Sequence, residues 1–444
     1  MSFLTIRPAW QSDRSKSHFG TIPSLTSYIL NMRLRVALPL LLVLAIFFAT
    51  FQSHASDLAL VGAKIYISPA APPIESGTIL VHSGHILSVG PFAEIKVPRG
   101  TTVIDCKGLV VTAGFWNSHV HILLPGLLHA ENLSSGQITL QLQQMLTRWG
   151  FTTVFDIASV LQNTNLIRHR IESGEVKGPQ ILTTGEPFWM KGGTPIYVQG
   201  FLEANHISIP EVESTAQAKE RVRQQINDGA DGIKIFANSA ERDGMLTMPL
   251  DLAQLIVAEA HHAGKPVFAH VSNNQGIDVA IQSGVDILAH TTPTDDLWSP
   301  SFVHRLTAAH MALTPTLTLW EVVSPNASPD ELEKGMSKAA QQLGAFYQAG
   351  GQVLFGTDVG FIERFDTSEE LKWMSRAGMS FQGILASLTT NPAQRFGHAT
   401  HSGRIGKGMD ADLVVLSADP AQNTSAFSKV RYTIRGGDVI YAEK

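Results

Sequence analysis

The chain has 444 residues, enough for about three domains of about 150 residues, or for one large barrel with a small companion domain. Hydrophobic residues make up 44% of it and charged residues 16%, which excludes an intrinsically disordered protein. The net charge of -5 excludes a strongly basic surface, so we expect no nucleic acid as partner. A single cysteine, Cys106, excludes a disulfide scaffold and a thiolate metal site, which leaves the 17 histidines as candidate metal ligands.

The N-terminal segment predicts a secretory signal. Residues 36–51 form an apolar run without charge, Arg33 and Arg35 precede it, and Ser53-His54-Ala55 has the small-x-small pattern of a cleavage site. The alternative is an uncleaved membrane anchor, but the run is shorter than the ~20 residues that a spanning helix needs. We therefore interpret residues 1–55 as an N-terminal extension and signal peptide.

This interpretation places the mature protein outside the cytoplasm, in the bacterial periplasm or secreted. Met32 stands directly before the basic residues, so we expect translation to start there. The near absence of cysteine fits an oxidising compartment. Contact with a membrane is expected only through an uncleaved signal.

The rest of the chain predicts two kinds of structure. Residues 57–110 and the stretch from 403 to the C-terminus consist of short β-like runs with turn glycines. Between them, short apolar runs alternate with segments of helical period, at 137–149, 215–228, 251–264, 273–284 and 367–378. The apolar runs are FWNSHVHI, TTVFDIA, QILTTGEP, GIKIFAN, PVFAHV, DILAHT, ALTPTLT and VLFGTD. The alternation predicts an α/β fold with a (β/α)₈ TIM-type barrel over 112–398, beside a small β-sandwich built from 56–111 and 399–444.

Polar residues with metal-binding chemistry stand at the ends of five of these runs. They are His119 and His121 in the first run, Lys234 in the fourth, His270 in the fifth, His290 in the sixth and Asp358 in the eighth. In a TIM barrel the carboxyl ends of the strands form the active site. Alternation along a strand puts His119 and His121 on one face, and imidazole and carboxylate suit zinc and related divalent ions.

Each of these residues also has an ordinary structural explanation. His270 could be a hydrogen-bonded core residue, Lys234 a lysine at a strand edge, and Asp358 a cap for the segment that follows. Their coincidence at the strand ends of one barrel favours a metal site. A buried ammonium that faces imidazoles is costly unless it is chemically altered.

The chain resembles the metal-dependent amidohydrolase superfamily, in its imidazolonepropionase-related subgroup, over nearly all of 57–444. GFWNSHVH resembles the family's first-strand metal motif, and NPAQRFG followed by GRIGKGMDADLVVLSADP resembles its C-terminal signature. The chain departs from the family at Ala113-Gly114, where many members have Pro-Gly, and at Asn117, where they have an Asp. The loop GFIERFDTSEEL also lacks a histidine that members of the subgroup often carry.

The resemblance implies a centre of two divalent ions, which we expect to be zinc. It implies that His119, His121 and Asp358 bind the first ion, that His270 and His290 bind the second, and that Lys234, N6-carboxylated by CO₂, bridges both. Asp358 would be the catalytic residue that transfers the proton, and His290 would contact the substrate. The enzyme would be an exported hydrolase that cleaves a carbon–nitrogen bond of an amide or peptide with a metal-bound hydroxide, such as a dipeptidase or an N-acyl amino acid hydrolase.

Two other functions stay open. The first is a mononuclear imidazolonepropionase-like cyclic amidohydrolase or a deaminase, which would not need the bridging group on Lys234. The second is an inactive metal- or ligand-binding protein, against which the complete ligand set argues. The expected partner is a small-molecule amide or dipeptide, and the sequence is compatible with a homo-oligomer.

The segment after the third apolar run predicts part of the substrate pocket. GEPFWMKGGTPIYVQGF is long and glycine-hinged, and its aromatic residues are Phe188, Trp189, Tyr197 and Phe201. These residues could line an apolar pocket or pack between loops. Arg242 and Arg364 follow the fourth and eighth runs and could bind a substrate carboxylate or form surface ion pairs. His129 and His206 could contact the substrate from segments near the barrel mouth.

Overall fold

The computed structural model describes residues 57–242 and 244–443. The predicted signal peptide and the start at Met32 lie outside these residues and stay predictions. In the part of the chain that is described, no helix combines the length and apolar character that crossing a bilayer requires.

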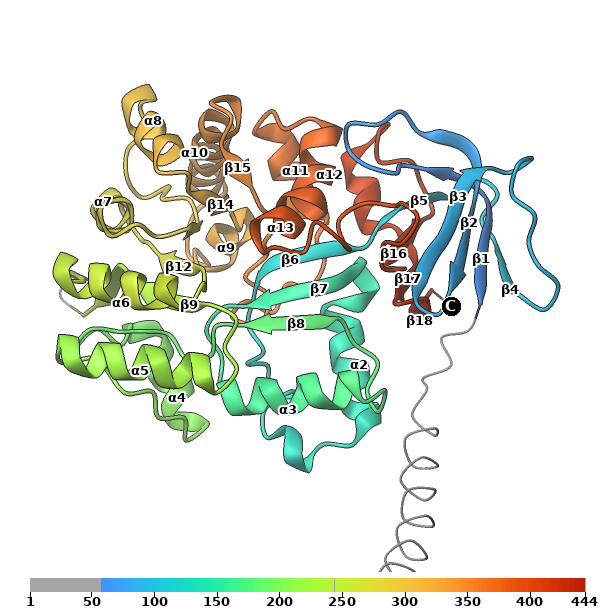
Figure 1. Cartoon of the computed structure of the whole chain (residues 1–444). Helices are drawn as coiled ribbons and strands as arrows, with labels where there is room; N and C mark the ends of the chain where they lie inside the picture. The colour runs from blue at the N-terminus through green and yellow to red at the C-terminus, as the bar shows by residue number, and fades with distance from the viewer. Residues whose placement is uncertain (1–56, 243, 444) are drawn as a thin grey trace, which may run out of the picture. The chain divides into compact units, whose positions relative to one another are not determined.

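Eight parallel strands within the described ranges carry the candidate site (Figure 1). One sheet consists of β6 (Phe115–Val120), β7 (Phe151–Asp156) and β8 (Gln180–Thr183). The other consists of β9 (Ile233–Phe236), β12 (Val267–His270), β13 (Ile287–Ala289), β14 (Ala312–Thr314) and β15 (Gln352–Val353). Nearly all their residues are buried, as expected for parallel strands that helices cover on the outside and that face one another inside.

Backbone hydrogen bonds join the two sheets on both sides. On one side, the amide of Ser118 donates to the carbonyl of Phe355 at 2.7 Å, and that of Asp358 donates to His119 at 2.9 Å. On the other side, the amide of Phe188 donates to the carbonyl of Lys234 at 2.8 Å. The strands therefore have a TIM-barrel-like arrangement, as the alternation of strands and helices predicted.

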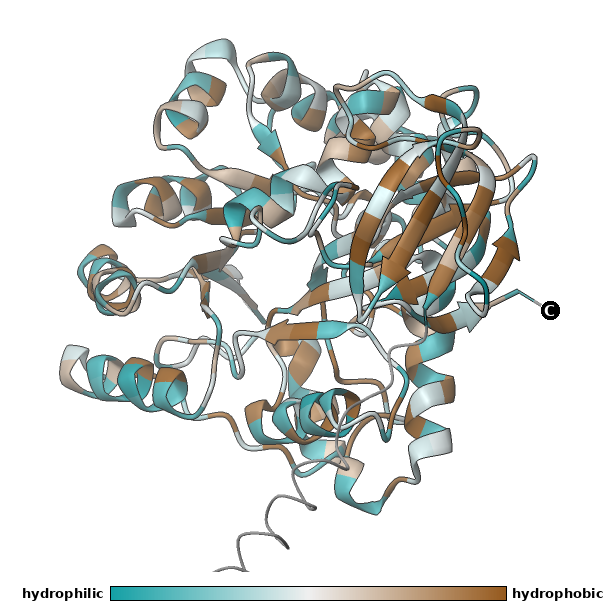
Figure 2. Ribbon diagram, turned by 45° about the vertical axis from the view of Figure 1, so that its right-hand side comes forward, coloured by the Kyte–Doolittle hydropathy of each residue, from teal (hydrophilic) through white to brown (hydrophobic). Residues whose placement is uncertain are grey.

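Amphipathic helices surround these strands. They are α2 (Ser135–Met145), α3 (Leu161–Glu172), α5 (Thr215–Asn227), α6 (Leu250–His262), α7 (Asn274–Ser283), α8 (Pro300–Ala308), α10 (Pro329–Gln348), α11 (Ser368–Arg376), α12 (Phe381–Leu388) and α13 (Thr390–Arg395). In α6, for example, Leu252, Ile256 and Ala260 are buried at a spacing of four residues. Figure 2 shows the result as stripes, brown on one side of a helix and teal on the other.

The two ends of the described chain form one further sheet. Its strands from the first end are β1 (Leu58–Ile65), β2 (Ile74–His82), β3 (His85–Pro91), β4 (Thr102–Asp105) and β5 (Val110–Ala113), and those from the second are β16 (Leu413–Leu416), β17 (Val430–Arg435) and β18 (Asp438–Ala442). The ends meet where β5 pairs antiparallel with β16, and Leu60, Ile79, Leu413 and Ile434 share one core on this sheet. The joining of the two ends agrees with the prediction. The second layer of a sandwich and the domain boundaries stay predictions.

The seventh apolar run differs from the expectation. Strand β14 ends at Thr314, and the short helix α9 (Leu317–Val322) begins where the run ALTPTLT was expected to continue extended. Pro315 cannot donate a hydrogen bond to a neighbouring strand, and Thr316 has a positive φ of 42°, so the strand cannot continue. The result brings Leu319 and Trp320 of α9 to the edge of the site.

Candidate metal centre

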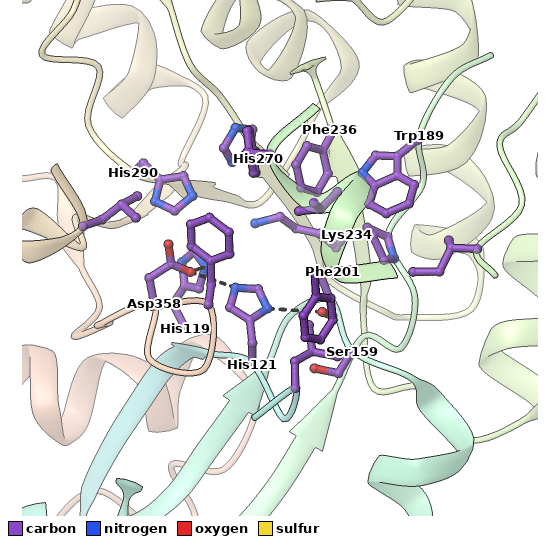
Figure 3. Close-up of a pocket in the computed structure, with 18 of the residues that line it drawn as sticks. His119, His121, Ser159, Trp189, Phe201, Lys234, Phe236, His270, His290 and Asp358 are labelled. Carbon is purple, nitrogen blue, oxygen red and sulfur yellow. Dashed lines mark hydrogen bonds and ion pairs between the residues drawn. The ribbon is translucent and has the colours of Figure 1, made fainter. Parts of the chain in front are cut away.

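The six predicted metal-site residues meet at the carboxyl ends of the parallel strands. They line one cavity of about 340 Å³, and the side chains are His119 and His121 from β6 and its end, Lys234 from β9, His270 from β12, His290 after β13 and Asp358 after β15. In Figure 3 they surround one space, and the amino group of Lys234 points into it. The structure thus brings the six residues together, and their roles as metal ligands stay a prediction.

Three of them form a compact group. Nitrogen and oxygen atoms of His119, His121 and Asp358 all lie within 4.8 Å of one another. Asp358 Oδ1 lies 2.9 Å from His119 Nε2 and 2.8 Å from His121 Nε2. His290 adjoins this group, since its ring centre is 4.8 Å from that of His119 and 4.9 Å from that of His270.

The hydrogen bonds around this group favour a cation. His121 Nδ1 lies 3.2 Å from the carbonyl of Ala158, which can only accept, so Nδ1 carries a proton. If the imidazole is neutral, Nε2 then carries a lone pair and faces the lone pairs of Asp358 Oδ1. Two acceptor atoms at this distance attract each other only if a proton or a metal ion lies between them. His119 Nε2 is buried, and its contact with Asp358 Oδ1 lacks the geometry of a hydrogen bond. These donors therefore fit a divalent ion bound by imidazole nitrogen and carboxylate oxygen.

The charge states of the group agree with this. Burial lowers the pKa of His119 and of His270 to about 3 and holds the pKa of His290 well below its usual value. The three imidazoles are thus neutral at neutral pH, the form that binds metal. Burial alone would raise the pKa of Asp358, but the adjacent His119 and His121 hold it well below its usual range.

Lys234 is the unusual member of the site. Its side chain is 1% exposed, and burial lowers the pKa of its amine to about 7. Among the described residues it forms no ion pair, and its amino group lies 5.9 Å from the ring centre of Phe236. A lysine in this environment is neutral in part at neutral pH, and a neutral amine is nucleophilic.

Sequence reasoning missed Asp156, the last residue of β7. Its carboxylate accepts hydrogen bonds from the amide of Ile122 at 3.0 Å and from the hydroxyls of Thr164 and Thr183 at 3.0 and 2.9 Å. Burial raises the pKa of this carboxyl, and the hydrogen bonds oppose that shift. Asp156 thereby holds the residue after His121 against β7. Its place at the end of a buried strand is the signal that could have identified it.

Asn117, one of the departures from the family pattern, is fully buried beneath the site. Its amide nitrogen donates to Thr357 Oγ1 at 2.8 Å, and its oxygen accepts from the amide of His119 at 3.3 Å. The side chain therefore connects β6 to the residue before Asp358. An amide supplies both the donor and the acceptor that this connection uses.

Two of the site residues are among the non-glycine residues with a positive φ. His290 and Asp358 have φ angles of 75° and 61°, in the left-handed region that residues with a side chain rarely adopt. Such strain persists where surrounding contacts fix the conformation, and it is common at functional sites. His290 is held through Nδ1, which lies 2.7 Å from Thr316 Oγ1.

Gly360, two residues after Asp358, is expected to tolerate no side chain. Its φ is 102°, and a Cβ there would lie 1.8 Å from the carbonyl oxygen of His121. We expect Gly360→Ala to lower the free energy of unfolding by about 3 kcal/mol or more, because strain and a backbone clash act together. Urea unfolding measures this. Gly100→Ala is the control, since Gly100 has a φ of 89° and open space around it; an equal loss in both variants would contradict the clash.

Four predicted substrate contacts lie elsewhere. Arg364 forms a bidentate ion pair with Glu321 and does not line the cavity. Arg242, His129 and His206 are exposed and also lie outside the cavity lining. Of the aromatic residues in the long segment after β8, Trp189, Tyr197 and Phe201 line the cavity, whereas Phe188 is buried in the core.

The chain is similar to several known hydrolases. Ochratoxinase from Aspergillus niger is 21% identical over 427 residues, which cover 86% of each chain. A dihydroorotase from Streptococcus pyogenes is also 21% identical, and the match covers 84% of this chain and 97% of the dihydroorotase. The crystal structure of a Xaa-Pro dipeptidase with bound methionine superposes with a TM-score of 0.72 at 22% identity and covers 87% of this chain and 100% of the dipeptidase. Structural likeness at this identity shows a common fold.

Family membership rests on the sequence itself. The profile described as "Amidohydrolase family" matches residues 110–440, well over half of the chain, and this range includes all six candidate site residues. The chain therefore belongs to the amidohydrolase family and is a hydrolase that acts on carbon–nitrogen bonds.

Proposed function

We propose that the protein is an exported amide hydrolase that works with two divalent metal ions, zinc in our expectation. The observation that carries the proposal is the convergence of two buried imidazole nitrogens on one carboxylate oxygen, with a buried lysine facing the same cavity. Export is supported by the predicted signal peptide alone, and an N-terminus near Ser56 in protein recovered outside the cytoplasm is its test.

The residues present suit two ions. His119, His121 and Asp358 would hold one, His270 and His290 would hold the other, and a carbamate on Lys234 would bridge them. Carboxylation would replace a buried cation by an anion, which removes the unfavourable charge of the amine among ligands. Divalent ions in such a site lower the pKa of a bound water and polarise the carbonyl that is attacked.

The chain's own residues would move the proton. Asp358, whose pKa lies well below its usual range, is ionised and can accept a proton from the attacking water. It would then deliver this proton to the leaving nitrogen, because an amide anion is a poor leaving group. His290 lines the cavity beside this group and would contact the substrate carbonyl from its side.

The buried Lys234 favours this function over a mononuclear cyclic amidohydrolase or deaminase. A site for a single ion does not need a bridging carbamate. An unmodified ammonium group buried in a cavity that imidazoles line would cost free energy. The relative named as a dipeptidase supports an amide as the bond cleaved.

Metal analysis of the purified full chain tests the proposal. We expect about two equivalents of divalent metal per chain, loss of amide hydrolysis after treatment with a chelator, and recovery when zinc is added back. Inductively coupled plasma mass spectrometry measures the metal, and a panel of dipeptides, N-acyl amino acids, anilides and lactams measures hydrolysis. One equivalent in the fully active enzyme would contradict the binuclear centre, and metal-independent activity would contradict the whole proposal.

A further inference from the structure

We propose that the substrate is an electrically neutral amide that carries an apolar group of about the size of an aromatic ring. This inference rests on the proposed function and adds the substrate class to it. It follows from three properties of the cavity: its apolar wall, the state of its polar side chains, and its size.

The wall opposite the metal-site residues is apolar and comes from segments far apart in the sequence. Helix α4 (Ile196–Ala204) and the residues after it contribute Tyr197, Val198, Phe201, Leu202, Ile207 and Ile209. Helix α9 and the residue after it contribute Leu319, Trp320 and Val323. Phe361 also lines the cavity, from the loop after β15. No residue of α4 is buried in the core, although most of the helix is apolar. Four of its apolar side chains, Tyr197, Val198, Phe201 and Leu202, line the cavity instead.

Two of these segments contact each other at the cavity. The rings of Tyr197 and Phe361 meet edge to face with their centres 5.6 Å apart. Phe361 follows Asp358 by three residues, so this contact places α4 beside the loop that carries the proposed proton carrier. A substrate group on this side of the scissile bond would be in contact with Phe201 and Tyr197.

Both serine hydroxyls of the lining are already engaged, whereas Trp189 Nε1 is a buried, uncharged donor without a hydrogen-bond partner in the described part of the chain. The Ser159 hydroxyl donates to Asp156 and accepts from the amide of Ile122 at 2.8 Å, and the Ser272 hydroxyl lies 3.0 Å from His270 Nε2. Apart from the histidines, Lys234 is the only basic side chain in the lining within the described residues, and it belongs to the metal centre.

A substrate carboxylate would thus find no guanidinium or free ammonium. Burying an unpaired carboxylate against an apolar wall is strongly unfavourable, and enzymes that select carboxylates usually provide a bidentate arginine. Arg364 is occupied by Glu321, and Arg242 is exposed outside the cavity. A free amino acid or dipeptide end is therefore disfavoured.

The cavity volume limits the size of the substrate. About 340 Å³ is near the lower end of the range of about 300–1,000 Å³ that small-molecule sites span. This is room for one aromatic ring and a short acyl chain. In the reaction the water oxygen bonds to the carbonyl carbon, the carbon–nitrogen bond breaks, and the nitrogen takes a proton, which yields a carboxylic acid and an amine.

Two compounds that differ by one carboxylate test the inference. N-(2-Phenylethyl)acetamide is neutral, and N-acetylphenylalanine is the same molecule with a carboxylate added beside the nitrogen. We expect the neutral compound to bind the metal-loaded full chain at least about tenfold more tightly in calorimetric titration. Equal affinity, tighter binding of the acid, or no binding of the neutral compound would overturn the inference.

Variants of the wall give a second readout. Phe201→Ala should weaken binding of the neutral compound by about tenfold, because a buried aromatic contact is lost, and should leave the affinity for zinc unchanged. Phe92→Ala is the matched control, since Phe92 is 54% exposed and lies outside the cavity. Unchanged affinity in Phe201→Ala would contradict the assigned wall. Metal content and chelator sensitivity report on the proposed function separately, so the two can fail independently.

Discussion

Replacing Asp358 with Asn is expected to lower kcat by a factor of about 10²–10⁴ or more while substantial metal stays bound. The Asn side chain keeps an oxygen at the position where two imidazole nitrogens converge, so it still offers a metal ligand. It cannot accept the proton of the attacking water and return it to the leaving nitrogen. The loss should therefore appear in the chemical step rather than in metal affinity.

Steady-state kinetics on the best substrate of the amide panel, together with metal analysis of the same preparation, measure both quantities. Asp366→Asn is a matched control in the same loop, because Asp366 is exposed and its carboxylate caps Ser368. A kcat close to the wild-type value in Asp358→Asn would show that another group carries the proton.

Lys234→Ala is expected to lose both metal and activity. The buried side chain has no ion pair in the described residues, and its amino group points into the space between the histidines (Figure 3). If a carbamate on this lysine supplies the anionic bridge, its removal takes away the ligand that the two metal ions share. The site then loses affinity for at least one of the two ions. A small carboxylic acid, such as acetate or propionate, fits the vacated volume and should restore part of both when it is supplied with zinc.

Lys234→Arg distinguishes the effect of a positive charge from that of the carbamate, because a guanidinium stays cationic and does not form a carbamate at neutral pH. It should be inactive and should not respond to acetate. Lys191→Ala is the control, since Lys191 is exposed and pairs with Glu213. Full metal content and activity in Lys234→Ala would refute the bridging role.

The fold and the positions of the metal-site residues could be predicted from the sequence, because both depend on local periodicity. Strands of the barrel are short apolar runs that end in a turn, so His119 and His270 could be placed near strand ends without knowledge of their neighbours. Lys234 differs from this expectation, because it is the second residue of the four-residue strand β9. Parallel strands all end on one side, and this geometric rule brings residues more than 200 positions apart together.

What the sequence left undetermined depends on contacts between distant segments. The partner of Arg364 is Glu321 on α9, and this helix exists because Pro315 ends the preceding strand. The same helix turns Trp320 into the cavity, so the substrate wall could not be assembled from the aromatic segment of 185–201 alone. Asp156 was missed for a similar reason, because its carboxylate accepts a hydrogen bond from the amide of Ile122, which lies just after β6.

The pairing of β5 with β16 has a consequence for the order of folding. Leu413 lies opposite Ala113, so the N-terminal strands can pair with one another, but β5 lacks its neighbour on one edge until residues some 300 positions later are available. Contacts of such separation form late, because the loop that they close is long. A ribosome or a translocation channel releases the N-terminal strands first, and they must wait, exposed along one edge, until the last strands emerge. A chain cut short before Leu413 would keep that edge unpaired and would be prone to aggregation. Folding of this sheet can therefore be completed only after the last strands have been synthesised.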